Sequence, residues 1–448
     1  MRKAKKAKFK NKQPQDGTLI GYTGKRAVYL QDDGKHVFIC GTTGSGKTVL
    51  LANFIKRAIE KDIPLLLIDG KGDIGNGSIL DIATKLNNSE NNNKNSNNKT
   101  KKKIYTINLS DPINSDKYNP FQNASATIIK DMIINMTDWS EEHYKLNAER
   151  YIQRITKLLE TGNIKPSFNK IIKCIPTEKF TELSLHLLKK ELITKNQHSE
   201  NIDLAKTSGQ VAQSSTARFS TIAESEVGQI FDDNGIDILT ALKENAIIIF
   251  ILNPLIYPEV SPAFGRLVLI DAKKAVSNLF NNQIKRTFFI MDEINVYAST
   301  VLTDLVNKSR SANITCMLAT QSLSDLDQAS GESFKEQIIE NTNNYILLRQ
   351  NSGINAEHWA NILGTKETME VSYQLEQRGL DTSTTGFGSA RKVREYLYHP
   401  DEIKTLRTGQ GIYLSRDTNH HSRINISMPN ELKTNQNESQ NEKEKINL

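Results

Sequence analysis

The 448-residue chain has little cysteine, no long hydrophobic run and few aromatic residues. Its three cysteines, Cys40, Cys174 and Cys316, lie far apart and indicate neither a disulfide framework nor a zinc-binding spacing. No uninterrupted apolar stretch reaches the roughly 18 residues that a membrane helix needs. Hydrophobic residues still make up 37% of the chain, which is enough for a real core. We therefore expect a cytoplasmic protein of two or three domains.

The chain also has no excess charge outside its first twelve residues. Residues 1–12 carry seven basic side chains and no acidic one, and the rest carries 51 of each sign. A basic tail of this kind can bind DNA phosphates or anionic lipid headgroups. A tail that only improves solubility is the alternative.

Residues 41–48 read Gly-Thr-Thr-Gly-Ser-Gly-Lys-Thr, a complete phosphate-binding loop. An apolar run precedes it at 37–40, and apolar residues at helical spacing follow it. Lys47 is expected to reach the outer phosphates of ATP, and Thr48 is expected to hold Mg²⁺. Because both flanks have the required pattern, a chance match in a loop is disfavoured. The backbone N–H groups that would surround the phosphates belong to Gly41, Thr42, Thr43, Gly44, Ser45 and Gly46.

Two later apolar runs end in polar residues suited to the same site. The run 287–291 ends in Asp292 and Glu293, and the run 314–319 is followed by Gln321. Strand ends of this kind face the ligand crevice of an open α/β sheet. We predict that Asp292 holds Mg²⁺ through water, that Glu293 activates the attacking water and that Gln321 senses the terminal phosphate. The alternatives are a helix cap for the acidic pair and a local backbone hydrogen bond for Gln321.

The wider pattern predicts a layered α/β nucleotide-binding domain. Most of the candidate strands are continuous apolar runs, as in a mainly parallel sheet that is buried on both faces. The candidate strands are residues 36–40, 64–68, 104–108, 246–252, 286–291, 314–319, 345–348 and 411–414.

One long stretch interrupts this alternation of strands and helices. Residues 124–237 contain no convincing strand, whereas Tyr144, Ala148, Tyr151, Ile155 and Leu158 follow a helical period. We predict an all-α domain inserted into the nucleotide-binding domain. The expected division is a disordered basic tail (1–16), a first nucleotide-binding part (17–123, with a disordered insert at 87–103), the all-α insertion (124–237), a second nucleotide-binding part (238–433) and a disordered polar tail (434–448).

These motifs together resemble the coupling proteins of conjugative type IV secretion (TraD/TraG-like), within the FtsK–HerA group of motors. Besides the phosphate loop, the acidic pair and residues 319–322, the resemblance rests on four segments. They are Asp69-Gly70-Lys71-Gly72-Asp73, Tyr118-Asn119-Pro120-Phe121, residues 341–350, and Gly388-Ser389-Ala390-Arg391 followed by His399-Pro400. The resemblance covers roughly residues 17–425.

The resemblance implies a RecA-like P-loop motor that works as a homo-hexamer, with DNA held independently of sequence in a central channel. It also implies an arginine from a neighbouring subunit, for which Arg310 is the candidate and Arg349 the rival. A surface or structural salt bridge is the alternative for either arginine. Gly70 stands where the family commonly has proline, and we expect no effect on the chemistry. Asp69 and Asp73 are expected near the crevice, with loop caps as the alternative.

The chain also departs from many family members, which begin with two membrane helices. The implied function is an ATPase that moves relaxase-bound DNA to the type IV secretion ATPases and inner-membrane components. The basic tail is then a candidate for peripheral contact with the cytoplasmic face of the inner membrane. Two alternatives stay open. One is a cytosolic FtsK/HerA-like motor in partition, repair or packaging, and the other is a slow nucleotide-switched adaptor that recruits cargo.

Overall fold

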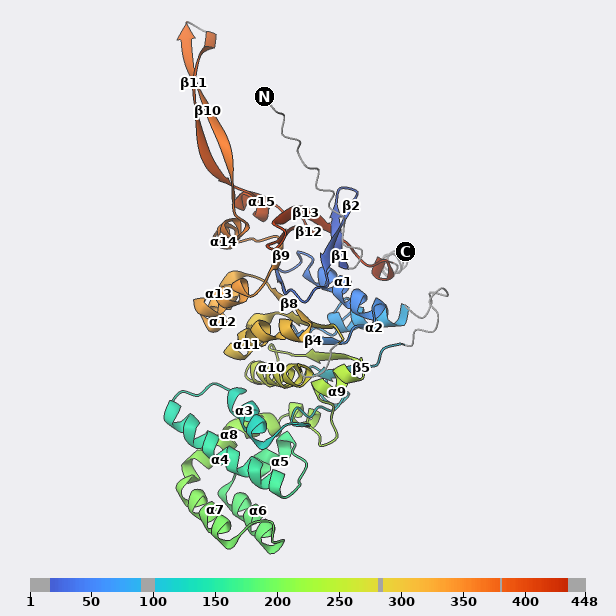
Figure 1. Ribbon diagram of the computed structural model, residues 1–448, viewed down its shortest axis with the longest axis vertical. Helices are drawn as coiled ribbons and strands as arrows, with labels where there is room; N and C mark the ends of the chain where they lie inside the picture. The colour runs from blue at the N-terminus through green and yellow to red at the C-terminus, as the bar shows by residue number, and fades with distance from the viewer. Residues whose placement is uncertain (1–16, 90–100, 281–284, 379–380, 434–448) are drawn as a thin grey trace, which may run out of the picture.

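The computed structural model describes residues 17–89, 101–280, 285–378 and 381–433. The molecule is elongated, with the sheet in the middle, a group of helices at one end and a long β-hairpin at the other (Figure 1). In these ranges, no helix combines the length and the hydrophobicity of a membrane span. The two predicted disordered tails, 1–16 and 434–448, lie outside the described residues.

The centre of the molecule is a sheet that contains eleven strands in the described ranges. Seven neighbouring strands are parallel, and most of their residues are buried on both faces of the sheet. This arrangement confirms the predicted α/β fold with a mainly parallel sheet. In spatial order, the parallel strands are β9 (Asn344–Leu348), β3 (Val37–Cys40), β8 (Ile314–Thr320), β7 (Thr287–Asp292), β4 (Leu65–Asp69), β6 (Ile247–Ile251) and β5 (Ile104–Asn108).

Antiparallel strands extend the sheet beyond β9. The sequence pattern predicted only the first of them. The strands β1 and β13 carry Thr, Gly, His and Asn and lack a long apolar run, whereas the short apolar run 27–30 in β2 was overlooked. In spatial order they are β12 (Gln410–Ser415), β13 (His420–Ile426), β1 (Gly17–Thr23) and β2 (Arg26–Gln31).

Helices cover both faces of the sheet, because alternate residues of each buried strand point to opposite sides. In β4, Leu65 and Leu67 join the apolar cluster under α1 (Lys47–Glu60) and α2 (Ile79–Ser89). Leu66 and Ile68 join the cluster under α10 (Val260–Leu279) and α11 (Thr300–Ser309). All four leucine and isoleucine side chains are fully buried.

The predicted disordered insert at 87–103 is too long at both ends. Residues 87–89 belong to α2, and buried Asn87 donates a hydrogen bond to the Lys102 carbonyl. The Lys102 ammonium in turn donates to the Asn245 carbonyl at 2.8 Å, just before β6. Polar side chains with fixed partners therefore order these flanks despite their composition, and the rest of the insert (90–100) lies outside the described residues.

Residues 126–223, all of them described, form helices joined by loops at one end of the molecule (Figure 1). Their buried apolar residues continue the apolar cluster on one face of the sheet, and among them the rings of Tyr151 and Phe180 meet edge to face 5.1 Å apart. The predicted all-α insertion is thus present, while the domain limits at 123/124 and 237/238 remain our proposal. The helices are α3 (Ala126–Asn135), α4 (Glu142–Thr161), α5 (Phe168–Lys173), α6 (Thr177–Lys189), α7 (Lys195–Thr207) and α8 (Gly209–Ala223).

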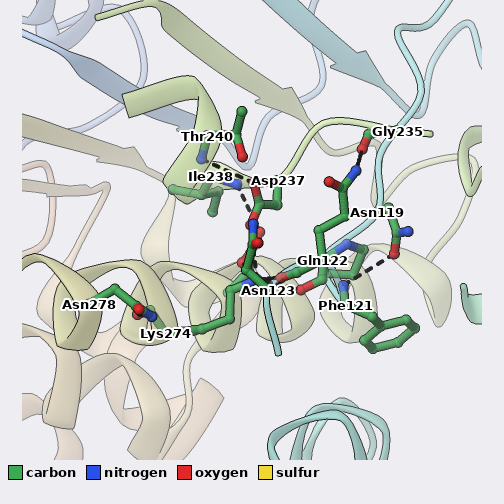
Figure 2. Close-up of polar contacts among 12 residues, drawn as sticks. Asn119, Phe121, Gln122, Asn123, Gly235, Asp237, Ile238, Thr240, Lys274 and Asn278 are labelled. Carbon is green, nitrogen blue, oxygen red and sulfur yellow. Dashed lines mark hydrogen bonds and ion pairs between the residues drawn. The ribbon is translucent and has the colours of Figure 1, made fainter. Parts of the chain in front are cut away.

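A buried lysine ties both connections of these helices to the sheet domain (Figure 2). Lys274, on α10, donates to the carbonyls of Pro120 and Gln122 where the chain enters the helices, each at 2.7 Å. Its ammonium also lies 3.2 Å from Asp237, where the chain returns, and 2.8 Å from Asp271. Because this ion cluster is almost fully buried, removing one partner would leave uncompensated charge.

At the opposite end, a hairpin projects away from the sheet (Figure 1). Its strands, β10 (Thr365–Arg378) and β11 (Asp381–Tyr396), pair antiparallel and form a separate two-stranded sheet. We predicted no strand here, because the segment is polar and has no apolar run. Met369 and Val371 are exposed on one of its faces.

Candidate nucleotide-binding site

The phosphate loop lies between β3 and α1, as the sequence predicts. Gly44 and Gly46 have positive φ angles of 72° and 111°, a region that residues with a side chain rarely adopt. Gly41 is required for a different reason, since a Cβ there would lie 2.5 Å from the Leu348 Cβ on β9. The glycines therefore let the loop turn tightly and sit close to the neighbouring strand.

The side chain of Lys47 crosses the loop and points at the acidic pair. Its Nζ donates to the Gly41 carbonyl at 2.7 Å and lies 3.5 Å from Glu293 Oε1. Both side chains of this ion pair are 8% exposed. Two residues that are nearly 250 positions apart in the sequence therefore meet at one edge of the sheet, as we predicted.

Gln321 bridges the phosphate loop and the acidic pair. Its strand, β8, lies between β3 and β7, so the side chain that follows β8 stands between the other two strand ends. Its Nε2 donates to Glu293 Oε1 at 3.0 Å, and its Oε1 accepts from Thr43 Oγ1 at 3.0 Å. The side chain thus contacts both the proposed base and the loop that would hold the phosphates.

The backbone at the acidic pair is held in an uncommon conformation. Glu293 has φ 48° and ψ 56°, in the left-handed region, between β7 and the short helix η3 (Ile294–Tyr297). Two donors hold the Asp292 carbonyl beside it, the Gly70 N–H at 3.1 Å and the Tyr297 hydroxyl at 3.0 Å. These two contacts, which the sequence did not reveal, fix the direction in which the Glu293 side chain leaves the strand.

Gly70 therefore has a role that we did not expect. A Cβ at this position would lie 2.8 Å from the Glu293 carbonyl oxygen and 2.9 Å from that of Asp292. Since real Cβ atoms essentially never approach so closely, a larger residue in this chain would require one of the two strand ends to shift. Gly70 permits the close packing of two neighbouring strand ends at the site.

Two buried carboxylates lie side by side below the loop. Asp69 and Asp292 are register partners on β4 and β7, and they are 2% and 4% exposed. Burial, together with the neighbouring charges of Glu293 and Asp69, raises the pKa of Asp292 to about 7. Burial likewise raises the pKa of Asp69 to about 6, although the Lys71 and Gly72 N–H groups donate to it. A cation at this place would favour the ionised form of both groups.

The loop and its surroundings also fit a magnesium–triphosphate. Glu293 Oε2, Ser45 Oγ and Thr42 Oγ1 are buried without a hydrogen-bond partner in the described part of the chain. Unpaired buried polar atoms at a phosphate loop are suited to a ligand that supplies their partners. Thr48, in the first turn of α1, and Asp292 are the residues that would hold Mg²⁺, together with phosphate oxygens and water.

Asp73 serves its own loop and not the site. Its carboxylate accepts from the Gly75 N–H at 3.0 Å and pairs with the exposed Lys71 ammonium at 3.1 Å. The hydrogen bond from Gly75 lowers the pKa of Asp73 below its ordinary value. The alternative interpretation as a loop cap therefore describes Asp73, while Asp69 both caps the loop and faces Asp292.

The two candidate arginines lie at opposite ends of the parallel strands. Arg310 is exposed and precedes β8, so the length of that strand, about 20 Å, separates it from the phosphate loop of its own chain. Arg349 follows β9 at the loop, and its carbonyl accepts from the Thr42 N–H at 3.0 Å. Arg310 is therefore out of reach of its own phosphate loop, whereas Arg349 lies beside it.

Two sequence families match this chain. The family described as the central domain of the helicase HerA matches residues 17–255, and the family described as the TraM recognition site of TraD and TraG matches residues 286–408. Two proteins of Mycoplasma pneumoniae, both described as uncharacterised, are also similar. The first is 33% identical over 104 residues (23% of this chain, 69% of the relative), and the second is 46% identical over 39 residues (9% of this chain, 32% of the relative).

Several solved structures have a similar fold. The unbound bacterial conjugative coupling protein TrwB (TrwBdeltaN70) has a TM-score of 0.65 at 15% identity, over 93% of this chain and 90% of that one. TrwB in complex with ADP and Mg²⁺ has a TM-score of 0.62 at 15% identity, over the same shares of the two chains. VirB4 of Thermoanaerobacter pseudethanolicus has a TM-score of 0.57 at 12% identity, over 93% of this chain and 98% of that one.

The family matches agree with the site geometry, since the HerA match covers the phosphate loop and the TraD and TraG match covers the acidic pair and Gln321. Together they span most of the described chain. The chain belongs to the HerA family of P-loop motor proteins and, within it, to the TraD/TraG-like conjugative coupling proteins.

Proposed function

We propose that this protein is an ATP-driven DNA translocase that delivers relaxase-bound DNA to a conjugative type IV secretion system. The observation that carries the proposal is the 3.5 Å approach of Lys47 Nζ to Glu293 Oε1, with Gln321 bonded to the same carboxylate oxygen. A phosphate-binding amine, a general base and a sensor are the parts that hydrolysis of a phosphoanhydride requires.

In the proposed reaction, the loop N–H groups and Lys47 hold the phosphates of ATP, and Thr48 and Asp292 hold Mg²⁺. The bound cation would neutralise charge on the β- and γ-phosphates. Glu293 accepts a proton from the attacking water as that water's oxygen bonds to the γ-phosphorus. The bond from this phosphorus to the β–γ bridging oxygen breaks, and ADP leaves with the electron pair.

Gln321 is suited to report the state of the nucleotide, because one side chain contacts both Glu293 and Thr43 of the loop. Loss of the γ-phosphate would change the partners of both contacts. We assign the trans-acting arginine to Arg310, whose place at the far edge of the sheet suits the site of a neighbouring subunit. A ring of such subunits, which we take to be a hexamer, would enclose DNA and hold its backbone without reading its sequence.

The same proposal assigns the projecting hairpin to partner contacts. Both of its strands lie in the segment that matches the TraM recognition site family, and Met369 is 68% exposed there. An isolated two-stranded sheet is marginally stable in water, so a partner that covers its apolar side would stabilise it. We propose that relaxosome or secretion components bind here. The basic tail would contact DNA or the cytoplasmic face of the inner membrane.

ATP turnover with and without single- and double-stranded DNA tests the proposal, with assembly state followed in the same samples. We expect hydrolysis that DNA stimulates and that Lys47→Ala or Glu293→Gln abolishes. A slow rate that DNA does not change would instead support a nucleotide-switched adaptor. If DNA stimulates hydrolysis but the organism that encodes the protein has no relaxase or secretion ATPases, a cytosolic motor with another task would be supported.

A further inference from the structure

A segment from the far end of the chain holds the phosphate loop from outside. Residues 405–409 connect α15 (Pro400–Lys404) to β12, and they pass over the loop. The Gly409 N–H donates to the Ser45 carbonyl at 3.0 Å, and Thr408 Oγ1 donates to the Gly44 carbonyl at 3.1 Å. Both contacts are made to carbonyl oxygens of the loop, so neither of them uses an N–H group of the loop.

These two contacts set the direction of N–H groups in the loop. A trans peptide unit is planar, so the N–H of one residue points opposite to the carbonyl of the residue before it. Holding the Ser45 carbonyl outward therefore turns the Gly46 N–H inward. Holding the Gly44 carbonyl likewise sets the Ser45 N–H, which donates to the Thr42 carbonyl at 3.1 Å and closes the turn of the loop. Inward-pointing N–H groups are what a phosphate-binding loop uses to surround an anion.

The conformation of Gly409 is set for this contact. Its φ is 77°, in the region that favours glycine, while a Cβ at this position would meet no atom within 4 Å. Glycine is therefore needed for the backbone angle alone and not for space. Opposite it, a Cβ on Gly46 would lie 3.4 Å from Gly409, which shows how closely the two backbones approach.

The same C-terminal stretch continues along the helix that follows the loop. Asn53 on α1 donates to the Ser427 carbonyl at 2.7 Å, and Lys56 pairs with Glu431 at 2.7 Å. Hydrogen bonds and an ion pair thus connect the loop and its helix to residues 408–431. The contacts of Thr408 and Gly409 are the ones that touch the loop itself.

We propose that residues 405–409 form a clasp that holds the phosphate loop in its binding conformation, with Thr408 and Gly409 as positioning residues for nucleotide binding. The inference rests on the proposed nucleotide site and adds to it a determinant more than 350 residues away in sequence. Neither residue needs to touch the nucleotide, because both act through the carbonyls of Gly44 and Ser45.

The matched pair Gly409→Ala and Gly331→Ala tests the clasp. Gly331, between α12 (Leu323–Ser330) and α13 (Glu332–Glu340), has φ 81° and also has no atom within 4 Å of an added Cβ. Both substitutions therefore place a side chain at a positive φ without a clash. For Gly409→Ala the backbone cost is about 1–2 kcal/mol, which corresponds to roughly 5- to 30-fold in an equilibrium constant. Only Gly409→Ala releases the loop. Gly409→Asn should retain much of the wild-type behaviour, because asparagine tolerates a positive φ better than alanine does.

Two measurements on the full chain decide the matter. We expect Gly409→Ala to raise the Kd for ADP with Mg²⁺ about 3- to 30-fold and to speed hydrogen exchange of N–H groups 42–48 in nucleotide-free protein. Gly331→Ala should change neither. Thr408→Val should give a smaller effect in the same direction, and Thr405→Val should give none, since the Thr405 hydroxyl bonds to the Asp401 carbonyl instead.

Equal exchange at 42–48 in the two alanine variants would overturn the clasp, whatever the nucleotide affinities are. If the wild-type chain bound no nucleotide, the proposed function would fail, and the exchange comparison would still decide whether the clasp orders the loop. A higher Kd in both alanine variants would also contradict the proposal, because the effect would then follow from general destabilisation.

Discussion

Replacing Asp292 with asparagine should stabilise the nucleotide-free protein. Its carboxylate is buried beside Asp69 and Glu293, and its pKa is raised from 3.8 to about 7. A difference of this size corresponds to roughly 4 kcal/mol against the ionised form. Asparagine keeps the shape and an acceptor for the Glu293 N–H without the charge. Because the neighbouring carboxylates of Asp69 and Glu293 share part of this cost, we expect the substitution to raise the unfolding free energy at pH 8 by about 2–4 kcal/mol.

The stabilisation by Asp292→Asn should depend on pH. The folded protein holds the Asp292 proton up to about pH 7, whereas the unfolded chain releases it near pH 3.8. In that window the folded state binds more protons, so this group lowers stability as the pH rises. The gain from Asp292→Asn should therefore be largest above pH 7 and shrink toward pH 4.

Urea unfolding of wild type and Asp292→Asn at pH 8 and pH 5, without nucleotide, measures the effect. Asp304→Asn is the control, because Asp304 is partly exposed and the Lys273 ammonium lowers its pKa. The control should lose a little stability or none. A loss of stability in Asp292→Asn at pH 8, or a gain that does not change with pH, would refute the reasoning. The variant should also lose the stabilisation that ATP with Mg²⁺ gives to the wild type.

Three further substitutions test the surroundings of the site. Gly70→Ala should lower ATP turnover at least about tenfold with a smaller effect on KM, since its Cβ would lie 2.8 Å from the Glu293 carbonyl; unchanged steady-state kinetics would contradict this. Gln321→Leu should lower turnover by about tenfold or more while the Kd for ATP stays within a few-fold, and a reversed pattern would argue against the sensor role. Lys274→Met should cost about 3–5 kcal/mol in urea unfolding, because it leaves two buried carboxylates unpaired, and a neutral result would contradict the assigned role of that cluster.

Much of the fold and the site could be predicted because buried parallel strands have a strong sequence signal. All eight predicted strands are present, and the residues that follow β3, β7 and β8 meet at one edge. The convergence of Lys47, Glu293 and Gln321 follows from the rule that parallel strands place their carboxyl ends at the same edge of the sheet. The helical insertion was equally visible, because its apolar residues recur at helical spacing.

The parts that were missed depend on contacts that leave no local pattern. Gly70 and Tyr297 matter because of the atoms that they approach across the sheet edge, and Gly409 matters through a backbone angle and a backbone N–H. The hairpin strands were missed because their described side chains, at 365–372 and 389–396, are exposed or half-buried and mostly polar. Edge strands of this kind lack the apolar alternation on which a sequence-based assignment depends.

Single-turnover hydrolysis by Glu293→Gln, with ATP binding measured on the same protein, tests the central claim most directly. If Lys47 and the acidic pair serve one magnesium–nucleotide, the variant should bind ATP with a Kd within a few-fold of wild type. Its hydrolysis should be slower by about a hundredfold or more. Hydrolysis by this variant at the wild-type rate, or loss of ATP binding with an intact fold, would contradict the account.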